Sequence, residues 1–244
     1  MSMYRDKFTV LIQGPANMSS LNNLESYLNY GDVVVSTWNG YKDNVLEIVG
    51  QFENCKLISE ETPSRENIVG ALKDSTFYYA LKGMYYGLKH VETEYVIKTR
   101  SDEFYGNLGP FVEEFLKNDD KLVCGNIFVR SDVPYHFGDH VFICKTKDVL
   151  SAIDNLLKSY ESQQELQSWM IQMGSTAENI LCSSILKSKN IDTTQDYKRV
   201  FLDNITIIDI NLCKPFLAMW QHGKKVYDNT FVNHHGIYNQ NDYK

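Results

Sequence analysis

The sequence contains no window close to the roughly 18 apolar residues that a membrane-spanning helix requires. Its N-terminus leads directly into a strand-like segment, without the apolar stretch and small-residue cleavage site of a signal peptide. We therefore expect a cytoplasmic protein, either free or at the cytoplasmic face of a membrane, with no transmembrane segment. The five cysteines are Cys55, Cys124, Cys144, Cys182 and Cys213. They form no CxxC pair, which argues against a disulfide framework and a cysteine zinc site.

An excess of basic residues is also lacking. The 24 Lys and Arg side chains are outnumbered by 31 Asp and Glu, which gives a net charge of −7 and a pI near 5.4. This balance excludes nucleic acid as the main partner. A hydrophobic share of 43% and an aromatic share of 13% suffice for a packed core, so the chain is not intrinsically disordered. Because no repeat or linker interrupts the sequence, residues 1–244 are predicted to form a single domain.

Several catalytic and nucleotide-binding motifs are absent. The sequence has neither GxGxxG nor GxxxxGK[ST], which argues against a dinucleotide-binding Rossmann domain and a P-loop NTPase. It also has no GxSxG and no cysteine-centred nucleophile signature. The chemistry must therefore be sought in residues outside these motifs.

Strand and helix patterns alternate along the chain. Short β-rich runs are predicted to be strands, at residues 8–12, 32–37, 56–59, 95–97, 121–129, 140–144 and 205–210. Apolar residues at spacings of three and four predict helices between them, including one over residues 75–90 and one that begins near Pro110. This order predicts an α/β fold with a mainly parallel sheet between two layers of helices. The C-terminal part, above all the tail from Lys214, is expected to be less regular.

Polar residues follow three of the predicted strands. They are Gln13, Gly14 and Pro15 after the first strand, Ser36, Thr37 and Trp38 at the second, and Arg100, Ser101 and Asp102 after the fourth. In open parallel sheets, ligands bind beyond the carboxyl ends of the strands. The three strand ends are therefore predicted to converge on one binding site. Each end taken alone is equally typical of a turn.

The segment over residues 95–103 is the most informative. An apolar strand is followed by two cations, Lys98 and Arg100, and then by two acids, Asp102 and Glu103. Mg²⁺ and Mn²⁺ take carboxylate and phosphate oxygens, and an arginine binds phosphate. This pattern therefore predicts a site for a metal-diphosphate group. A surface salt-bridge cluster is the alternative.

Three blocks resemble the WavE family of glycosyltransferases associated with lipopolysaccharide synthesis, found in bacteria with relatives in large DNA viruses. They are Ile-Gln-Gly-Pro at 12–15, Ser-Thr-Trp at 36–38, and Lys-Thr-Arg-Ser-Asp at 98–102. The similarity extends more weakly to residues 137–139 and 177–181, so it covers residues 8–185. In two places the sequence departs from the family: the helix before the fourth strand lacks an Asn-x-x-Arg-Gln element, and Ser101-Asp102-Glu103 is not a literal DxD.

The resemblance implies a GT-A fold, a nucleotide-sugar donor and a divalent cation, Mn²⁺ or Mg²⁺. The nucleotide-sugar half would be residues 1–105, and residues 106–244 would form the acceptor side and the tail. Asp102 would take the place of the metal-binding carboxylate. The donor would be bound by Gln13, Gly14, Pro15, Thr37, Trp38 and Arg100.

Two carboxylates are candidates for the general base. Glu178 lies at a predicted helix start, where the helix dipole favours an acid, but it also resembles the base of many inverting GT-A enzymes. Asp139, between His136 and His140, is the competing base. These two histidines do not predict zinc, because positions i and i+4 lie about 13 Å apart on a strand.

A third group of histidines lies in the C-terminal tail. His234 and His235 are typical of a polar surface turn. The resemblance offers an alternative, in which they complete the metal shell when the donor binds.

Together these observations predict a metal-assisted, inverting glycosyltransferase. The donor would be a UDP- or GDP-linked sugar, and the acceptor a glycan or glycolipid. Two alternatives remain open. A sugar nucleotidyltransferase would normally have a basic, glycine-rich loop after the first strand, and residues 13–17 contain no cation. A non-catalytic nucleotide- or carbohydrate-binding module would bind a nucleotide without turnover.

Overall fold

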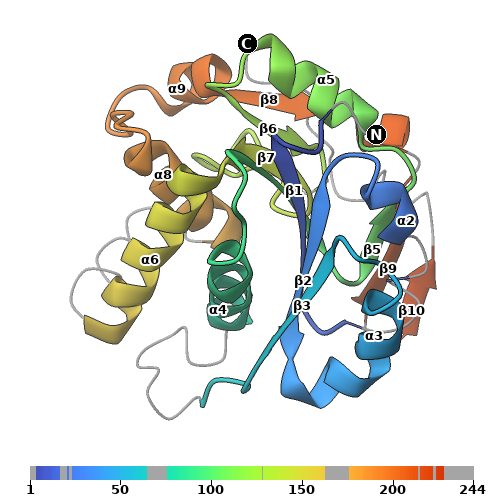
Figure 1. Cartoon of the computed structure of the whole chain (residues 1–244). Coiled ribbons are helices and arrows are strands. Elements are labelled where there is room, and N and C mark those ends of the chain that lie inside the picture. Colours follow the sequence, from blue (N-terminus) through green and yellow to red (C-terminus); the bar gives the residue numbers. More distant parts are fainter. Residues whose placement is uncertain are drawn as a thin grey trace.

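The computed structural model describes residues 4–16, 21, 24–64, 76–127, 129–162, 176–213, 215–221 and 224–227. Seven strands form a central sheet in the order β3-β2-β1-β4-β7-β6-β8 (Figure 1). Their bounds are β1 Phe8–Gln13, β2 Asp32–Trp38, β3 Cys55–Glu60, β4 Tyr95–Arg100, β6 Leu122–Gly125, β7 Phe142–Lys145 and β8 Ile205–Ile208.

Most neighbours in this sheet are parallel, and β7 is the exception. β1 pairs in parallel with β2 and β4, β2 with β3, and β6 with β8. β7 runs antiparallel to both β4 and β6. No helix is described between β6 and β7, and a parallel connection needs a crossover that is usually helical. The predicted α/β class with a mainly parallel sheet is confirmed, and the sheet is mixed.

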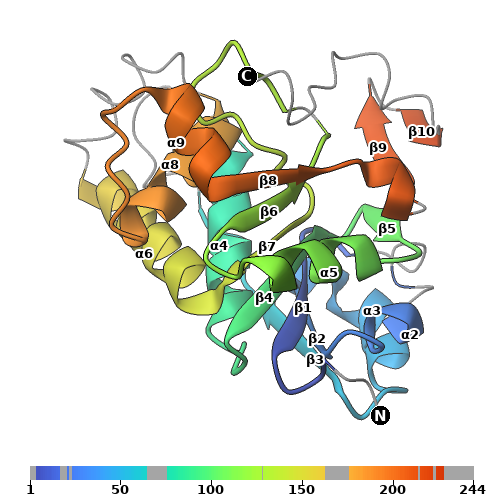
Figure 2. The ribbon, with the colours of Figure 1, turned by 90° about the horizontal axis from the view of Figure 1, so that it is seen from above.

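Helices cover both faces of the sheet (Figures 1 and 2). The helices α4, α6 and α8 lie on one side, and α2 and α3 on the other (Figure 1). Pro110 lies in the first turn of α5, as predicted. Ser19 and Ser20, either of which could cap a helix that extends to Tyr30, lie outside the described residues. The helices are α2 Leu24–Tyr27, α3 Lys42–Val49, α4 Phe77–Leu88, α5 Gly109–Lys117, α6 Thr146–Ser162, α8 Ala177–Ser188 and α9 Tyr197–Asn204, with 3-10 turns η1 Asn39–Tyr41 and η3 Ile210–Cys213.

Alternation along the strands divides the core into two layers. In β1, Leu11 packs into the layer that contains α4, α6 and α8, whereas Val10 and Ile12 pack into the layer that contains α2, α3 and α5. In β4, Val96 faces the α4 layer and Ile97 the α2 layer. Because side chains alternate between the two faces of a sheet, each strand also determines which way its terminal polar residues point.

A small second sheet corrects the expectation of an irregular tail. β9, Pro215–Gln221, pairs antiparallel with β5, Glu103–Tyr105, and with β10, Lys224–Tyr227. One of the two partners of β9, the strand β5, lies more than a hundred residues earlier in the chain, and a local pattern gives no sign of that pairing. The predicted metal ligands His234 and His235 lie outside the described residues.

No helix in the described part of the chain is long and apolar enough to cross a membrane. All five cysteines are free, and four of them are buried. Burial raises the pKa of Cys124 and of Cys144 to about 12, so these thiols stay protonated. They serve as small apolar core residues, as their positions within apolar runs indicate.

Candidate functional site

A cavity of about 760 Å³ lies at the carboxyl ends of β1, β2 and β4, beside the N-terminal turns of α4. Apolar and aromatic side chains form one part of its wall, and charged side chains form another. The cavity is lined by Gln13, Gly14, Pro15, Trp38, Tyr41, Thr62, Thr76, Phe77, Tyr79, Ala80, Met84, Lys98, Arg100, Ser101, Asp102 and Asp139. The predicted convergence of the three strand ends is therefore present in the structure.

Strand alternation explains which of the predicted donor residues line this cavity. Leu11 in β1 and Val34 in β2 face the α4 layer. Gln13 lies two residues after Leu11 and Trp38 lies four residues after Val34, so both side chains point to the same face, and both line the cavity. Thr37 occupies the intervening position and is buried, and its Oγ1 accepts a hydrogen bond of 3.1 Å from Ala16 N. Thr37 therefore does not line the cavity, and it holds the loop after β1 instead.

The loop after β1 is bonded to both neighbouring strand ends. Gly14 N donates to Ser36 O at 3.1 Å, and Ser101 Oγ donates to Pro15 O, also at 3.1 Å. Gly14 has a φ of +132°, and a Cβ there would lie 2.6 Å from Ser101 Oγ. Both the backbone conformation and the close approach require glycine at this position.

The aromatic part of the wall is centred on Trp38. Its ring makes edge-to-face contacts with Tyr79 and with Tyr86, each at a centroid distance of 6.4 Å. The helix segment that departs from the WavE pattern provides Phe77, Tyr79 and Ala80 to the cavity. At that segment the cavity wall is therefore apolar and aromatic.

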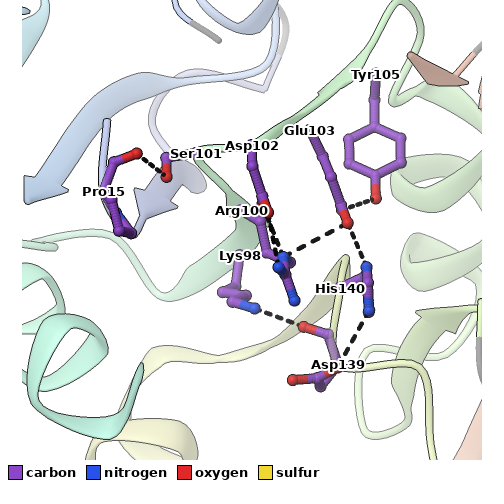
Figure 3. A network of polar contacts seen from close by, with 9 residues as sticks. All are labelled: Pro15, Lys98, Arg100, Ser101, Asp102, Glu103, Tyr105, Asp139 and His140. Carbon is purple, nitrogen blue, oxygen red and sulfur yellow. Dashed lines mark hydrogen bonds and ion pairs between the residues drawn. The ribbon is translucent and has the colours of Figure 1, made fainter. Parts of the chain in front are cut away.

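Arg100 and Asp102 form a two-point salt bridge at the charged part of the wall (Figure 3). Arg100 Nε donates to Asp102 Oδ1 and Nη2 donates to Oδ2, both at 2.8 Å. Arg100 Nε also lies 3.5 Å from Oε1 of Glu103. Burial lowers the pKa of Arg100, but its bonds to Asp102 and the charge of Glu103 outweigh burial, so the pKa is raised overall. Arg100 is thus a permanent cation whose orientation is fixed by two carboxylates.

Behind Arg100 lies a buried polar network that sequence reasoning missed. The side chain of Glu103 is fully buried, contacts His140 Nδ1 and accepts a hydrogen bond of 2.6 Å from Tyr105 OH (Figure 3). Burial raises the pKa of Glu103, but His140 and Arg100 lower it more strongly, to about 2. Glu103 is therefore a buried carboxylate that stays charged because cationic and hydrogen-bonding partners surround it. Its position next to Asp102 was the one available signal.

Lys98 is a second cation at the cavity. Its side chain is buried, and Nζ donates to the backbone carbonyl of Asp139 at 2.6 Å (Figure 3). Nζ also lies 5.8 Å from the centroid of the Phe142 ring. Burial lowers the pKa of Lys98, and the nearby charge of Asp139 opposes that effect only in part. In the sequence, Lys98 was one member of a charged cluster without a separate role.

Of the two candidate bases, Asp139 is the one that lines the cavity. Its side chain is 21% exposed, and Oδ1 lies 4.0 Å from Nε2 of His140. Residues 137–141 have irregular backbone before β7 begins. The strand spacing used in the argument against zinc therefore does not apply to His136 and His140. His136 neighbours the carboxylate of Glu178, and His140 contacts that of Glu103.

Glu178 lies in the first turn of α8, as predicted, but it is not part of the cavity lining. Thr176 caps this helix in a capping box with Asn179, so the cap does not depend on Glu178. Glu178 Oε2 lies 3.7 Å from Nε2 of the buried His136. Burial lowers the pKa of His136, and the negative charge of Glu178 opposes that effect.

The described residues do not fit a resident divalent cation. No group of three His, Cys, Asp or Glu side chains suited to a metal ion occurs in the part of the chain that the structure describes. Asp102 is the predicted ligand, and Arg100 already occupies both of its carboxylate oxygens. A cation would have to displace the guanidinium from Asp102. The predicted Mn²⁺ or Mg²⁺ stays a prediction.

The sequence matches no protein-family model and no curated protein. Among solved structures, the chain is similar to S. aureus TarS with a TM-score of 0.48 and 14% identity, over 83% of this chain and 35% of that one. It is also similar to the glycosyltransferase GlyE of Streptococcus pneumoniae TIGR4, with a TM-score of 0.42 and 12% identity, over 84% of this chain and 45% of that one.

A third similar structure is the inositol-1-phosphate CTP transferase of T. maritima. Here the TM-score is 0.45 and the identity 11%, over 86% of this chain and 87% of that one. The chain spans less than half of the TarS and GlyE chains. All three TM-scores lie below 0.5, and no family model matches the sequence. The WavE resemblance therefore stays a prediction. A functional assignment must come from the residues of the cavity.

Proposed function

We propose that this chain is a glycosyltransferase of the GT-A type, which transfers a sugar from a nucleotide donor to a hydroxyl of a glycan or glycolipid. The observation that supports the proposal is the composition of the cavity. One part of its wall is aromatic, with Trp38 and Tyr79, and another part has Lys98, Arg100 and Asp139. A nucleobase stacks on aromatic rings, and a diphosphate binds cations. A nucleoside-diphosphate sugar offers both kinds of group in one molecule.

The charged residues have distinct roles in this proposal. Arg100, oriented by Asp102 and Glu103, faces the negative charge that develops on the leaving diphosphate. Asp139 accepts the proton of the acceptor hydroxyl. The hydroxyl oxygen then forms a bond to the anomeric carbon, while the bond from that carbon to the diphosphate oxygen breaks. The bonding electron pair leaves with the nucleoside diphosphate. A single displacement of this kind inverts the anomeric configuration.

Asp139 is preferred to Glu178 as the base because it shares the cavity with the donor residues. A base must reach the acceptor oxygen at hydrogen-bonding distance. Glu178 instead lies 3.7 Å from His136 and does not line the cavity. Glu178 is therefore the second candidate, for an acceptor that approaches from the α8 side.

A sugar nucleotidyltransferase is the closest alternative. Such an enzyme binds a nucleoside triphosphate and releases pyrophosphate, so it needs cations for a third phosphate. The loop after β1 provides Gly14, Pro15 and Ala16, none of them charged. The scarcity of cations at this loop favours the glycosyltransferase.

The test has two stages. First, UDP-, GDP-, CMP- and dTDP-linked sugars are screened by thermal shift, since a ligand that binds the folded state raises its melting temperature. Then Asp139→Asn and Glu178→Gln are compared in a transfer assay with the donor that binds. We expect Asp139→Asn to lower the rate by about 10²–10⁴-fold and Glu178→Gln to lower it only a few-fold.

Each other outcome has a defined meaning. A large loss in Glu178→Gln with a near-normal Asp139→Asn enzyme would move the base to α8. Pyrophosphate release from a nucleoside triphosphate and a sugar phosphate would assign the nucleotidyltransferase. Tight nucleotide binding without turnover of any donor would assign a binding module.

A further inference from the structure

Lys98 differs from every other cation whose side chain the structure describes. It is the one lysine or arginine among these residues that is buried, with a relative exposure of 3%. The neighbouring Arg100, by comparison, is 33% exposed and has Asp102 and Glu103 as carboxylate partners. Among the described residues, no carboxylate lies within ion-pair distance of Lys98 Nζ. Nζ donates a hydrogen bond to the carbonyl of Asp139.

A buried ammonium without a carboxylate partner is unfavourable. Charged groups in protein interiors are normally paired, because their desolvation costs several kcal/mol. An ammonium has three N–H donors, and the Asp139 carbonyl takes one of them. The face of the Phe142 ring stabilises the charge to a smaller extent. Within the part of the chain that the structure describes, two N–H donors of Lys98 thus remain for a group that enters the cavity.

The placement of Lys98 restricts what this group can be. Lys98 and Arg100 are two residues apart in β4, so both point to the α4 side of the sheet, and both line the cavity. Asp102 already balances the charge of Arg100, whereas no carboxylate of the described residues lies at ion-pair distance from Lys98. An anion with oxygens spread over several ångströms can accept hydrogen bonds from both residues. A diphosphate has that shape and charge.

We propose that Lys98 is a diphosphate-binding residue, and that the same ammonium holds the backbone of the candidate base Asp139. This rests on the proposed function, because it takes the cavity to be a nucleotide site. The hydrogen bond from Lys98 to Asp139 links diphosphate binding to the position of the candidate base. Lys98 would bind the diphosphate directly and would keep Asp139 in place beside it. It would therefore act in donor binding and, as a positioning residue, in proton transfer.

Calorimetry with a graded series of ligands tests the binding part. The ligands are inorganic pyrophosphate, UDP and GDP, with uridine and guanosine as phosphate-free references. The proteins are the wild type, Lys98→Met and Lys98→Gln, which keeps a donor for the Asp139 carbonyl but removes the charge. A hydrogen bond to a charged group is typically worth roughly 10–100-fold in affinity. We expect both variants to bind pyrophosphate and the better nucleoside diphosphate roughly 10–100-fold more weakly, with nucleoside binding within about twofold of the wild type.

Lys121→Met is the matched control. Lys121 Nζ also donates to a backbone carbonyl, that of Leu202 at 3.0 Å, but Lys121 does not line the cavity. This variant should bind all ligands like the wild type. Because Gln retains an N–H donor for the Asp139 carbonyl, Lys98→Gln should retain more of its turnover rate at saturating donor than Lys98→Met. An equal kcat in the two variants would remove the positioning role.

Two results would overturn the binding role. One is a wild type that gains no affinity from the phosphates of UDP or GDP and does not bind pyrophosphate. The other is a folded Lys98→Met or Lys98→Gln variant that binds UDP, GDP and pyrophosphate like the wild type. Failure of the proposed function has a different signature: Lys98-dependent diphosphate binding without transfer of any sugar would retain the Lys98 site and remove the glycosyltransferase.

Discussion

Arg100 and Asp102 stand two residues apart at the end of β4, and each satisfies the other through two hydrogen bonds of 2.8 Å. The carboxylate that a strand-end pattern predicts as a metal ligand is thus already the partner of a guanidinium. In this arrangement Asp102 orients the Arg100 guanidinium at the cavity. A divalent cation could bind Asp102 only by displacing Arg100, and this displacement can be tested by chelation.

The first prediction concerns this metal. If Asp102 keeps Arg100 as its partner when the donor binds, EDTA should change the affinity for UDP or GDP by less than about threefold. Asp102→Asn should then weaken binding through a disordered Arg100, and equally with and without Mn²⁺. Calorimetry in EDTA and in Mn²⁺ measures both effects. The contrary result is a tenfold loss of nucleotide affinity in EDTA that Mn²⁺ reverses in the wild type but that does not occur in Asp102→Asn. It would show that a cation displaces Arg100 from Asp102.

The second prediction concerns the buried carboxylate behind Arg100. Glu103→Gln removes the charge that His140, Arg100 and Tyr105 surround. Removing one member of a buried, paired cluster leaves the others unsatisfied, and we expect the free energy of unfolding to fall by about 3 kcal/mol. Denaturant unfolding measures this loss, with the exposed Glu113→Gln on α5 as the control. Equal stability of the two variants would show that the charge of Glu103 makes no net contribution to the free energy of unfolding.

The third prediction is a pH dependence that arises from His136. Because burial lowers the pKa of folded His136, the unfolded chain takes up this proton at a higher pH than the folded chain does. The free energy of unfolding should therefore fall as the pH decreases below about 6.5, the ordinary pKa of histidine. In His136→Gln this component should be absent.

Denaturant unfolding at pH 8 and pH 5.5 measures the difference between wild type and variant. The exposed His90→Gln is the control and should keep the wild-type pH dependence. Parallel curves for wild type and His136→Gln would mean that folding does not shift the pKa of His136.

The fourth prediction concerns the loop after β1. Gly14→Ala places a Cβ at 2.6 Å from Ser101 Oγ, on a backbone with φ of +132°. Backbone strain of this kind costs of order 1–3 kcal/mol. If the loop moved to relieve this strain, the residues that it contributes to the cavity would shift. We expect a lower melting temperature and nucleotide binding weakened by at least about tenfold.

Gly40→Ala is the matched control, because a Cβ at Gly40 meets nothing within 4 Å. It should retain wild-type stability and binding. Wild-type nucleotide affinity in Gly14→Ala would show that the loop after β1 is not part of the binding site.

The sequence by itself determined the fold class and the location of the site. Apolar runs of strand length alternate with helical spacings, and both are local patterns. The rule that ligands bind at the carboxyl ends of parallel strands then places Gln13, Trp38 and Arg100 at one edge. The structure confirms the fold class and brings these three side chains to one cavity, whereas nucleotide binding by that cavity stays a prediction.

Only the tertiary structure decided which side chains share the cavity and which partners they have. Glu103 and His140 are 37 residues apart, and β5 meets β9 across more than a hundred residues, so no local pattern contains these contacts. Alternation along β2 separates Thr37 from Trp38, although the two are adjacent in sequence. Lys98 became distinct from Arg100 only when two facts were known: its burial, and the absence of a carboxylate at ion-pair distance among the residues that the structure describes. Burial and pairing depend on the order of the strands, because that order sets which distant residues surround each charge.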